Sequence, residues 1–419
     1  MTIKILKGNI IHAPSSDKLS VHKDSFLVSN DGKIEGVYQE IPEKYKDIDI
    51  SDKGNSLIIP SFCDMHLHAS QFYQRGIGMD RPLLDWLETY TFPNEARFSD
   101  SEYARRVYEE FIEEIIRHGT LSCAIFATVH YEATHILLEL LEKKGINAFV
   151  GKLNMDNNCP DYIREDTMQS YLDTERFIVE HKDYQTAKPI ITPRFSPSCT
   201  EDLHQKLGLL ADKYNTPVQS HLCESIPEIE WVKQLFPSYK NYGEVYAKNR
   251  LLGNVPTLMA HCIELNDDEI ELMKNENCIA VHCPDSNINV SSGIMPAEYL
   301  MRNNIKVALG SDIGGGHSVA LYRTMASAIQ TSKARKYAYN DSGHLTVAQV
   351  LYMATTVGGS FFGRLGNFNE GYDFTALVID DSNICGFEME PEERLERFLY
   401  IGDDRNIKER YIKGVYIAI

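Results

Sequence analysis

The sequence has few positive charges, no long apolar run and no ordered pattern of cysteines. Its 419 residues include 42 Lys or Arg and 60 Asp or Glu, so the formal net charge is −18 at pH 7. A field of this sign repels phosphate groups, which argues against nucleic acid and anionic membrane surfaces as partners. No apolar stretch is long enough to cross a bilayer, and the segment from Met1 to Ile11 does not have the pattern of a signal peptide. A small neutral substrate fits this charge balance better.

The cysteines favour a reduced compartment. There are nine of them, an odd number, and they are scattered through apolar segments and not spaced as a disulfide framework. We therefore expect a cytoplasmic protein. Low-complexity segments and long linkers are also absent from the sequence, and the overall composition is that of a globular protein.

The two ends of the chain have the character of a small β domain. Short β-like runs separated by turn signals fill the segment before residue 60, and similar short runs return near the C-terminus. We expect both ends to assemble into one β-sandwich domain. The predicted division is 1–59 and 366–419 for the two parts of this domain, with a catalytic domain over 60–365.

Between the two ends, strand-like apolar runs alternate with amphipathic helical stretches. Eight such runs are predicted as strands: 57–68, 120–128, 147–154, 189–196, 217–222, 257–261, 278–283 and 306–312. Helical patterns lie between them at 101–117, 131–144 and 267–275, and a last helix is predicted over 346–362. Eight strand–helix units predict an α/β fold, a (β/α)8 TIM-like barrel with its helices outside.

Candidate metal ligands lie at the carboxyl ends of these predicted strands, where active sites of this barrel type gather. His66 and His68 are two residues apart, so both side chains point to the same side of an extended chain. His221 ends the fifth run and Asp312 ends the eighth. Three imidazoles and a carboxylate suit zinc, with ferrous iron as the alternative, and leave one position for water.

The same rim carries groups that could move protons. Zinc lowers the pKa of bound water to about 7, so hydroxide becomes available at neutral pH. Glu224, three residues after His221, could protonate a ring nitrogen before an amine leaves. Asp312 would take the proton of the water, and His261 at the end of the sixth run could orient the hydroxide.

Three further residues could recognise a planar heterocycle. Arg194 and Phe195 stand at the end of the fourth run, where a cation could hold a carbonyl oxygen and a ring could pack on the substrate. Gln71 follows His68 and offers an amide that both donates and accepts.

Several motifs together resemble those of the amidohydrolase superfamily and, within it, the guanine deaminases. The first motif, from Pro60 to His68, is similar to the superfamily's Pro-Gly-x-x-Asp-x-His-x-His, with Ser61 in place of the usual Gly. The segment 82–98 is similar to one that follows these ligands in guanine deaminases. Further matches are 193–196, 221–224, 259–261, 282–287, 310–312 and 399–407.

The resemblance implies zinc-dependent hydrolysis of free guanine to xanthine and ammonia. It implies one zinc ion per subunit on His66, His68, His221 and Asp312, with Glu224 as proton shuttle. The purine contacts it implies are Gln71, Trp86, Arg194 and Phe195, and it implies a homodimer. Two alternatives stay open: a deaminase of another heterocycle, such as 8-oxoguanine, a triazine or an adenosine-type substrate, and a non-catalytic binding or scaffold protein on the same barrel.

Overall fold

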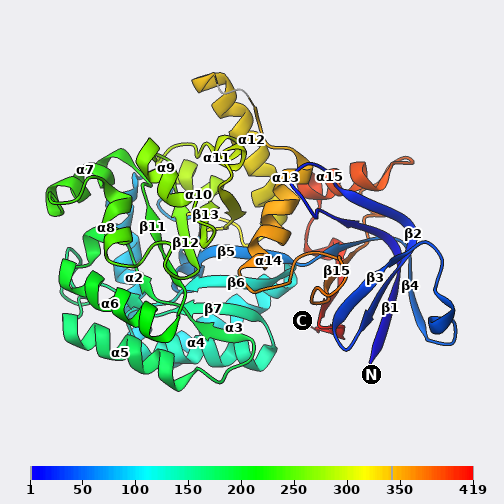
Figure 1. The fold of residues 1–419 in the computed structure, drawn as a ribbon, viewed down its shortest axis with the longest axis horizontal. Helices are drawn as coiled ribbons and strands as arrows, with labels where there is room; N and C mark the ends of the chain where they lie inside the picture. Colours follow the sequence, from blue (N-terminus) through cyan, green and yellow to red (C-terminus); the bar gives the residue numbers. More distant parts are fainter. Residues whose placement is uncertain (1, 341–342, 419) are drawn as a thin grey trace.

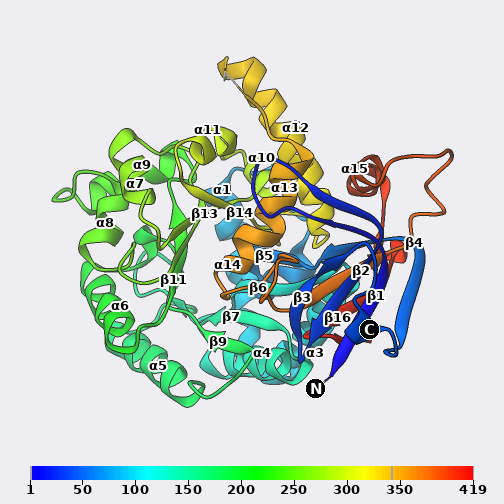
Figure 2. The same cartoon turned by 45° about the vertical axis from the view of Figure 1, so that its right-hand side comes forward.

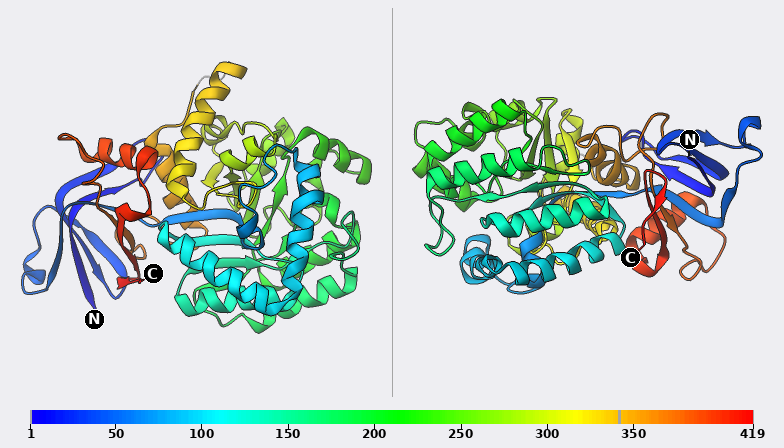
Figure 3. Two further views of the ribbon diagram at one scale, coloured as in Figure 1. Left: turned by 180° about the vertical axis from the view of Figure 1, so that it is seen from behind. Right: turned by 90° about the horizontal axis from the view of Figure 1, so that it is seen from below.

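The computed structural model describes residues 2–340 and 343–418, so the first residue of the predicted range 1–59 and the last residue of 366–419 lie outside it. Figure 1 shows a body of parallel strands with helices around it, next to a sheet built from both chain ends. The two termini lie on the side of that sheet, as Figure 3 also shows. Among the described residues, no helix combines the length and the apolar character needed to cross a membrane.

The terminal sheet has seven strands in the order β17-β16-β15-β4-β1-β2-β3. Strand β4 pairs antiparallel with β15, so the beginning and the end of the chain meet at the centre of this sheet. Its strands are β1 (Ile3–His12), β2 (Ser20–Asn30), β3 (Lys33–Tyr38), β4 (Ile50–Pro60), β15 (Thr375–Ile379), β16 (Ile407–Ile412) and β17 (Val415–Tyr416).

The central body holds two four-stranded parallel sheets, in the orders β5-β6-β7-β9 and β11-β12-β13-β14, and a short parallel pair β8-β10. Most of these strands are buried along their whole length, which explains their continuous apolar runs. They are β5 (Phe62–His68), β6 (Thr120–Phe126), β7 (Asn147–Gly151), β8 (Leu153–Asn154), β9 (Ala187–Pro189), β10 (Thr192–Pro193), β11 (Val218–Leu222), β12 (Thr257–His261), β13 (Cys278–His282) and β14 (Lys306–Leu309).

Three of the predicted strands are each divided in the structure. Residues 57–60 of the predicted strand 57–68 belong to β4 of the terminal sheet, so the first strand of the central body begins at Phe62. The predicted strand 147–154 is divided into β7 and β8. The structure divides the region of the predicted strand 189–196 between β9, which ends at Pro189, and β10, which has two residues, and a 3-10 turn begins at Ser196. Proline has no N–H for a sheet ladder, so Pro189 and Pro193 cannot sustain a continuous strand.

Helices cover the outside of the parallel strands, and Figure 2 shows α4, α5 and α6 outside β7, β9 and β11. The α-helices of the described residues are α1 (Leu83–Trp86), α2 (Phe92–Ala96), α3 (Ser101–Arg117), α4 (Tyr131–Lys144), α5 (Thr167–Glu180), α6 (Glu201–Tyr214), α7 (Ile226–Leu235), α8 (Tyr242–Lys248), α9 (Asp267–Met273), α10 (Pro284–Asn289), α11 (Ala297–Arg302), α12 (Leu321–Tyr339), α13 (Val347–Tyr352), α14 (Gly358–Ser360) and α15 (Pro391–Ile401). Of these, α15 lies against β1 and β2 of the terminal sheet. Two π-helical turns, Leu87–Thr91 and Met353–Val357, join α1 to α2 and α13 to α14.

Local sequence explains where helices such as α3 and α4 begin and end. Asp100 caps α3 by accepting hydrogen bonds from the N–H groups of Glu102 and Tyr103. Buried residues then recur at three- and four-residue spacing, as on the inner face of an amphipathic helix. Helix α4 ends at Gly145, whose φ of 70° is the left-handed conformation that favours glycine.

The two parallel sheets are in contact at both edges. A parallel bridge joins Ile191 to Val218 on one side. On the other side the N–H of Asp312 donates to the carbonyl of His66 (2.9 Å), and the N–H of His68 donates to that of Ile313 (2.8 Å). The end of β5 therefore lies against the segment that follows β14, and the sequence-predicted ligands of these two segments meet.

Candidate active site

Imidazoles and a carboxylate from four separate segments meet at one end of the parallel strands. His66 and His68 come from β5, His221 from β11, His261 from β12, and Asp312 from the turn after β14. All five side chains are buried. One ligand atom from each of His66, His68 and His221 lies within 4.8 Å of the others, and the same holds for His66, His261 and Asp312. The structure thus brings together the donors that the sequence predicted from strand ends.

The backbone turns sharply at two of these positions. His261 has a φ of 71° and Asp312 a φ of 47°, both in the left-handed region that residues other than glycine rarely adopt. Unfavourable backbone conformations of this kind concentrate at functional sites, where the surrounding structure holds them. His261 is the last residue of β12, and Asp312 lies shortly after the end of β14. Both turns of the backbone therefore occur where the side chains of these residues join the cluster.

The donor set fits a metal cation. His66 Nε2 makes no hydrogen bond within the described part of the chain, although it lies 3.1 Å from Asp312 Oδ1. His68 Nε2 lies 3.3 Å from the same oxygen. Nδ1 of His221 lies 2.5 Å from the backbone oxygen of Arg194, and a donor bond there leaves Nε2 as the lone-pair nitrogen. A cation among these atoms would satisfy buried groups that otherwise crowd one another.

The protonation states suit ligation. Burial lowers the pKa of His66 to about 4, so this imidazole is neutral at pH 7 and has a lone pair to offer. Burial alone would raise the pKa of Asp312, but the neighbouring His66 and His68 hold it well below its ordinary value. His66 therefore presents a neutral nitrogen, and Asp312 an ionised carboxylate, to a metal ion.

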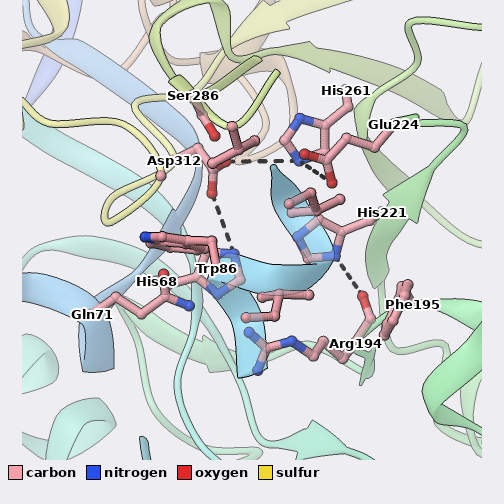
Figure 4. A pocket seen from close by; sticks show the side chains of 14 residues that line it. His68, Gln71, Trp86, Arg194, Phe195, His221, Glu224, His261, Ser286 and Asp312 are labelled. Carbon is pink, nitrogen blue, oxygen red and sulfur yellow. Dashed lines mark hydrogen bonds and ion pairs between the residues drawn. The ribbon is translucent and has the colours of Figure 1, made fainter. Parts of the chain in front are cut away.

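A pocket opens directly above this cluster, and Figure 4 shows its side chains. Nine of the ten residues predicted for the site line it, and the tenth, His66, lies in the cluster below. The lining residues are His68, Gln71, Leu83, Trp86, Leu87, Arg194, Phe195, His221, Glu224, His261, Ser286, Val290, Asp312 and Gly315. Apolar walls with a few convergent polar groups are typical of a small-molecule site.

The Glu224 carboxyl group is held between two partners. Ser292 Oγ donates to Glu224 Oε1 (2.9 Å), and Oε2 lies 3.5 Å from His261 Nε2. Glu228 supports the backbone, because its carboxylate accepts from the N–H groups of Glu224 (2.9 Å) and Ser225 (3.3 Å). Burial raises the pKa of Glu224 to about 7. A carboxyl group with this pKa can take up and release a proton near neutral pH.

His261 is held on its other side as well. Its Nδ1 lies 2.8 Å from Oδ1 of Asn287, an acceptor, so Nδ1 carries the proton. Burial lowers the pKa of His261, but nearby Glu224 and Asp312 more than offset this, so the net direction is upward. The Nε2 atom of His261 can therefore interact with negatively charged groups in the site.

Some residues around the pocket were missed in the sequence. Glu95 bridges Arg194 and Gln71, and Ser292 holds Glu224. Glu95 falls within the segment 82–98 that was singled out by resemblance, whereas no motif pointed to Ser292. Asn287 lies in a noted motif, but its contact with His261 could not be read from spacing.

Comparisons with known proteins agree over nearly the whole chain. Residues 57–417 match the model of the amidohydrolase family. A guanine deaminase of Dictyostelium discoideum is 39% identical, with 98% of this chain and 97% of the relative covered. A guanine deaminase of Rattus norvegicus is 38% identical, with coverage of 99% and 96%. A crystal structure of guanine deaminase from C. acetobutylicum with bound guanine in the active site is 50% identical, with a TM-score of 0.98 and full coverage of both chains.

Proposed function

Because the chain belongs to the amidohydrolase family, we propose that it is a metal-dependent hydrolase that converts free guanine and water to xanthine and ammonia. One observation carries the proposal: a single pocket joins a metal-binding donor set, a buried carboxyl group and two side chains with N–H donors. The substrate assignment is supported by the 50% identity to a guanine deaminase that binds guanine in its active site.

We propose that the resident metal is zinc, held by His66, His68, His221 and Asp312. Three neutral imidazoles and one carboxylate form a nitrogen and oxygen set that zinc prefers, and ferrous iron would accept the same set. When bound there, zinc would acidify a water molecule so that hydroxide is available near pH 7.

In this proposal the residues of the chain move the protons. Hydroxide adds to the ring carbon that bears the amine, and the electron pair of a C=N bond goes to the adjacent ring nitrogen, which Glu224 protonates. The C–N bond to the exocyclic nitrogen then breaks, and ammonia leaves with a proton that Asp312 has received from the water. As the C=O bond of xanthine forms, the proton of the added hydroxyl group passes to Glu224, which is thereby protonated again. His261 would orient the attacking oxygen and stabilise the negative charge that develops on it.

The substrate-binding side is assigned to Gln71, Trp86, Arg194 and Phe195. The Arg194 guanidinium suits the carbonyl oxygen of guanine, and the Gln71 amide adds a second donor. Trp86 and Phe195 offer flat apolar surfaces to the purine ring. Trp86 is itself fixed, because its Nε1 donates to the carbonyl of Ile77 (2.9 Å).

We also propose the finer architecture. The parallel strands would close into a (β/α)8 barrel over 60–365, supported by the contacts of β5 with the segment after β14. Residues 1–59 and 366–419 would form a β-sandwich domain beside it. We also propose a cytoplasmic homodimer. None of the nine cysteines is paired in a disulfide, which agrees with a reducing compartment.

The test is to measure ammonia release and ultraviolet spectra with purified zinc-loaded protein. Guanine, adenine, cytosine, 8-oxoguanine and a triazine are given separately, each with a chelator-treated control. We expect conversion of guanine to xanthine well above the other rings, and its loss after chelation. A preference for another ring would refute the guanine assignment, and inactivity on all rings would favour a non-catalytic binding or scaffold protein.

A further inference from the structure

Glu95 lies between the two side chains that offer donors to the substrate. Its Oε1 accepts from Gln71 Nε2 (2.9 Å), and its Oε2 accepts from Arg194 Nη1 (2.5 Å). The side chains of Glu95 and Arg194 are each only 3% exposed. Because each oxygen of this buried carboxylate accepts a hydrogen bond from a residue that faces the substrate, Glu95 fixes the orientation of both side chains.

The contacts fix the orientation of the Gln71 amide. Its Oε1 accepts from the backbone N–H of Gly314 (3.0 Å), a group that can only donate, and its Nε2 faces the carboxylate of Glu95, which can only accept. The amide therefore cannot turn over without breaking both hydrogen bonds. Since Gln71 lines the pocket, the second N–H of Nε2 remains available as a donor there.

Arg194 is constrained in a similar way. Its guanidinium lies over the ring of Phe92, 5.3 Å from the centroid, as well as against Glu95. Phe92 and Glu95 both belong to α2, so one short helix supplies an aromatic face and a carboxylate to the same cation. The remaining N–H groups of Arg194 are left to the pocket that this residue lines.

Helix α2 is itself anchored to the 3-10 helix Ala69–Gln74, which carries Gln71. Gln74 Nε2 donates to Thr91 Oγ1 (2.8 Å), and Asn94 Nδ2 donates to the carbonyl of Ser70 (2.8 Å). The π-helical turn Leu87–Thr91 links this anchored part to Trp86 and Leu87 in the pocket wall. The helix thus connects the wall of the pocket with the residues that hold its donors.

In Figure 4 the Gln71 amide and the Arg194 guanidinium lie away from His261 and Glu224, on the other side of the His68 and His221 rings. With the reacting carbon near Glu224, a carbonyl oxygen elsewhere on the purine would meet these donors. A purine with hydrogen in place of that carbonyl oxygen would leave the Arg194 guanidinium and the Gln71 N–H without an acceptor. Leaving buried donors unpaired costs binding free energy, so such a purine should bind much more weakly.

We propose that Glu95 is a positioning residue for substrate specificity. It holds Gln71 and Arg194 as a fixed pair of donors, and this pair selects purines that carry a carbonyl oxygen away from the reacting carbon. The inference rests on the proposed function, since it takes this pocket as the guanine site.

The experiment compares wild-type protein with Glu95→Gln in equilibrium binding of xanthine and of 2-hydroxypurine. 2-Hydroxypurine keeps the oxygen on the reacting carbon but lacks the carbonyl oxygen that would meet Gln71 and Arg194. For Glu95→Gln we expect xanthine affinity to fall about 10- to 100-fold and 2-hydroxypurine affinity to change less than about threefold. In turnover of guanine, KM should rise more than kcat falls. Metal content and the thermal midpoint, measured in parallel, verify that the variant is folded.

Asp381→Asn is the matched control, because it also removes a buried carboxylate that pairs with an arginine. Asp381 Oδ1 lies 2.5 Å from Arg394 Nη2, and the two side chains are 2% and 7% exposed, respectively. Neither residue lines the pocket. It should leave both affinities unchanged. Equal losses for xanthine and 2-hydroxypurine in Glu95→Gln, or no loss, would overturn the inference. So would a wild-type protein that binds neither ligand. A wild-type protein that binds xanthine but does not turn over guanine would refute the proposed function. A loss of xanthine affinity alone in Glu95→Gln would in that case still support the role of Glu95.

Discussion

Removal of the Ser292 hydroxyl tests whether the orientation of Glu224 limits the rate. Ser292 Oγ donates to one oxygen of the Glu224 carboxyl group at 2.9 Å, and both residues are buried, at 8% and 4% exposure. Ser292 is not among the residues that line the pocket. Its substitution by Ala should therefore disturb the proton-transfer group and leave substrate contacts in place.

The magnitude follows from the kind of bond that is lost. A hydrogen bond to a charged group contributes about 1.5–3 kcal/mol, and about 1.4 kcal/mol corresponds to a factor of ten in rate. Because His261 remains beside the other oxygen, part of the orientation survives. We expect kcat of Ser292→Ala to fall about 10- to 30-fold with KM within about twofold of the wild-type value.

Steady-state kinetics with guanine would measure both constants. Ser292→Thr keeps the hydroxyl and should restore most of kcat. Ser291→Ala removes a hydroxyl from the exposed neighbouring position and serves as the control. An unchanged kcat in Ser292→Ala, or a rise in KM that accounts for the whole loss, would show that this hydrogen bond does not position the proton shuttle.

Two further predictions concern the chemical step and acid stability. Glu224→Gln should bind guanine and metal as the wild type does but lose about 10²- to 10⁴-fold in kcat, measured by ammonia release, and full activity would reject its role. Despite partial burial, hydrogen bonds from the backbone N–H groups of Gln185, Thr186 and Ala187 and from the Thr186 hydroxyl lower the pKa of Glu142 to about 2. The ionised form thus stabilises the fold above about pH 4.5, and this is lost as the pH falls towards 2. In urea unfolding, the free energy of unfolding of Glu142→Gln should be about 1 kcal/mol lower than that of the wild type at pH 7, after allowance for solvent screening. The difference should be smaller at pH 3. A difference that stays constant between these pH values would contradict the assignment.

The ends of the parallel strands could be predicted from the sequence, because polar residues able to bind a metal or move a proton follow buried apolar runs there. Continuous apolar runs predicted the parallel strands, and polar residues such as His221 and His261 stood out at the ends of these runs. Proline-containing segments were less readable, since Pro189 and Pro193 keep an extended backbone while removing ladder donors. The predicted strand 189–196 therefore spanned what are two short strands in the structure.

The supporting shell of the site could not be predicted in the same way. Glu95 and Arg194 are 99 positions apart, and Ser292 and Glu224 are 68 positions apart. Nothing in local periodicity distinguishes a glutamate that pairs across the fold from one that faces solvent at a helix end. Such pairings depend on how the strands are packed, so they become visible only in three dimensions.

The contact between the two ends of the parallel body has a consequence for folding. Asp64 accepts a hydrogen bond from the N–H of Ser311 across 247 positions of the chain (2.9 Å). The same two segments carry His66, His68 and Asp312, and the other donors of the metal cluster come from β11 and β12. A growing or truncated chain has only part of the cluster, so high affinity for the ion arises late, once distant segments have met. Binding then selectively stabilises the completed fold by mass action, and the unfolding midpoint should depend on the concentration of free metal.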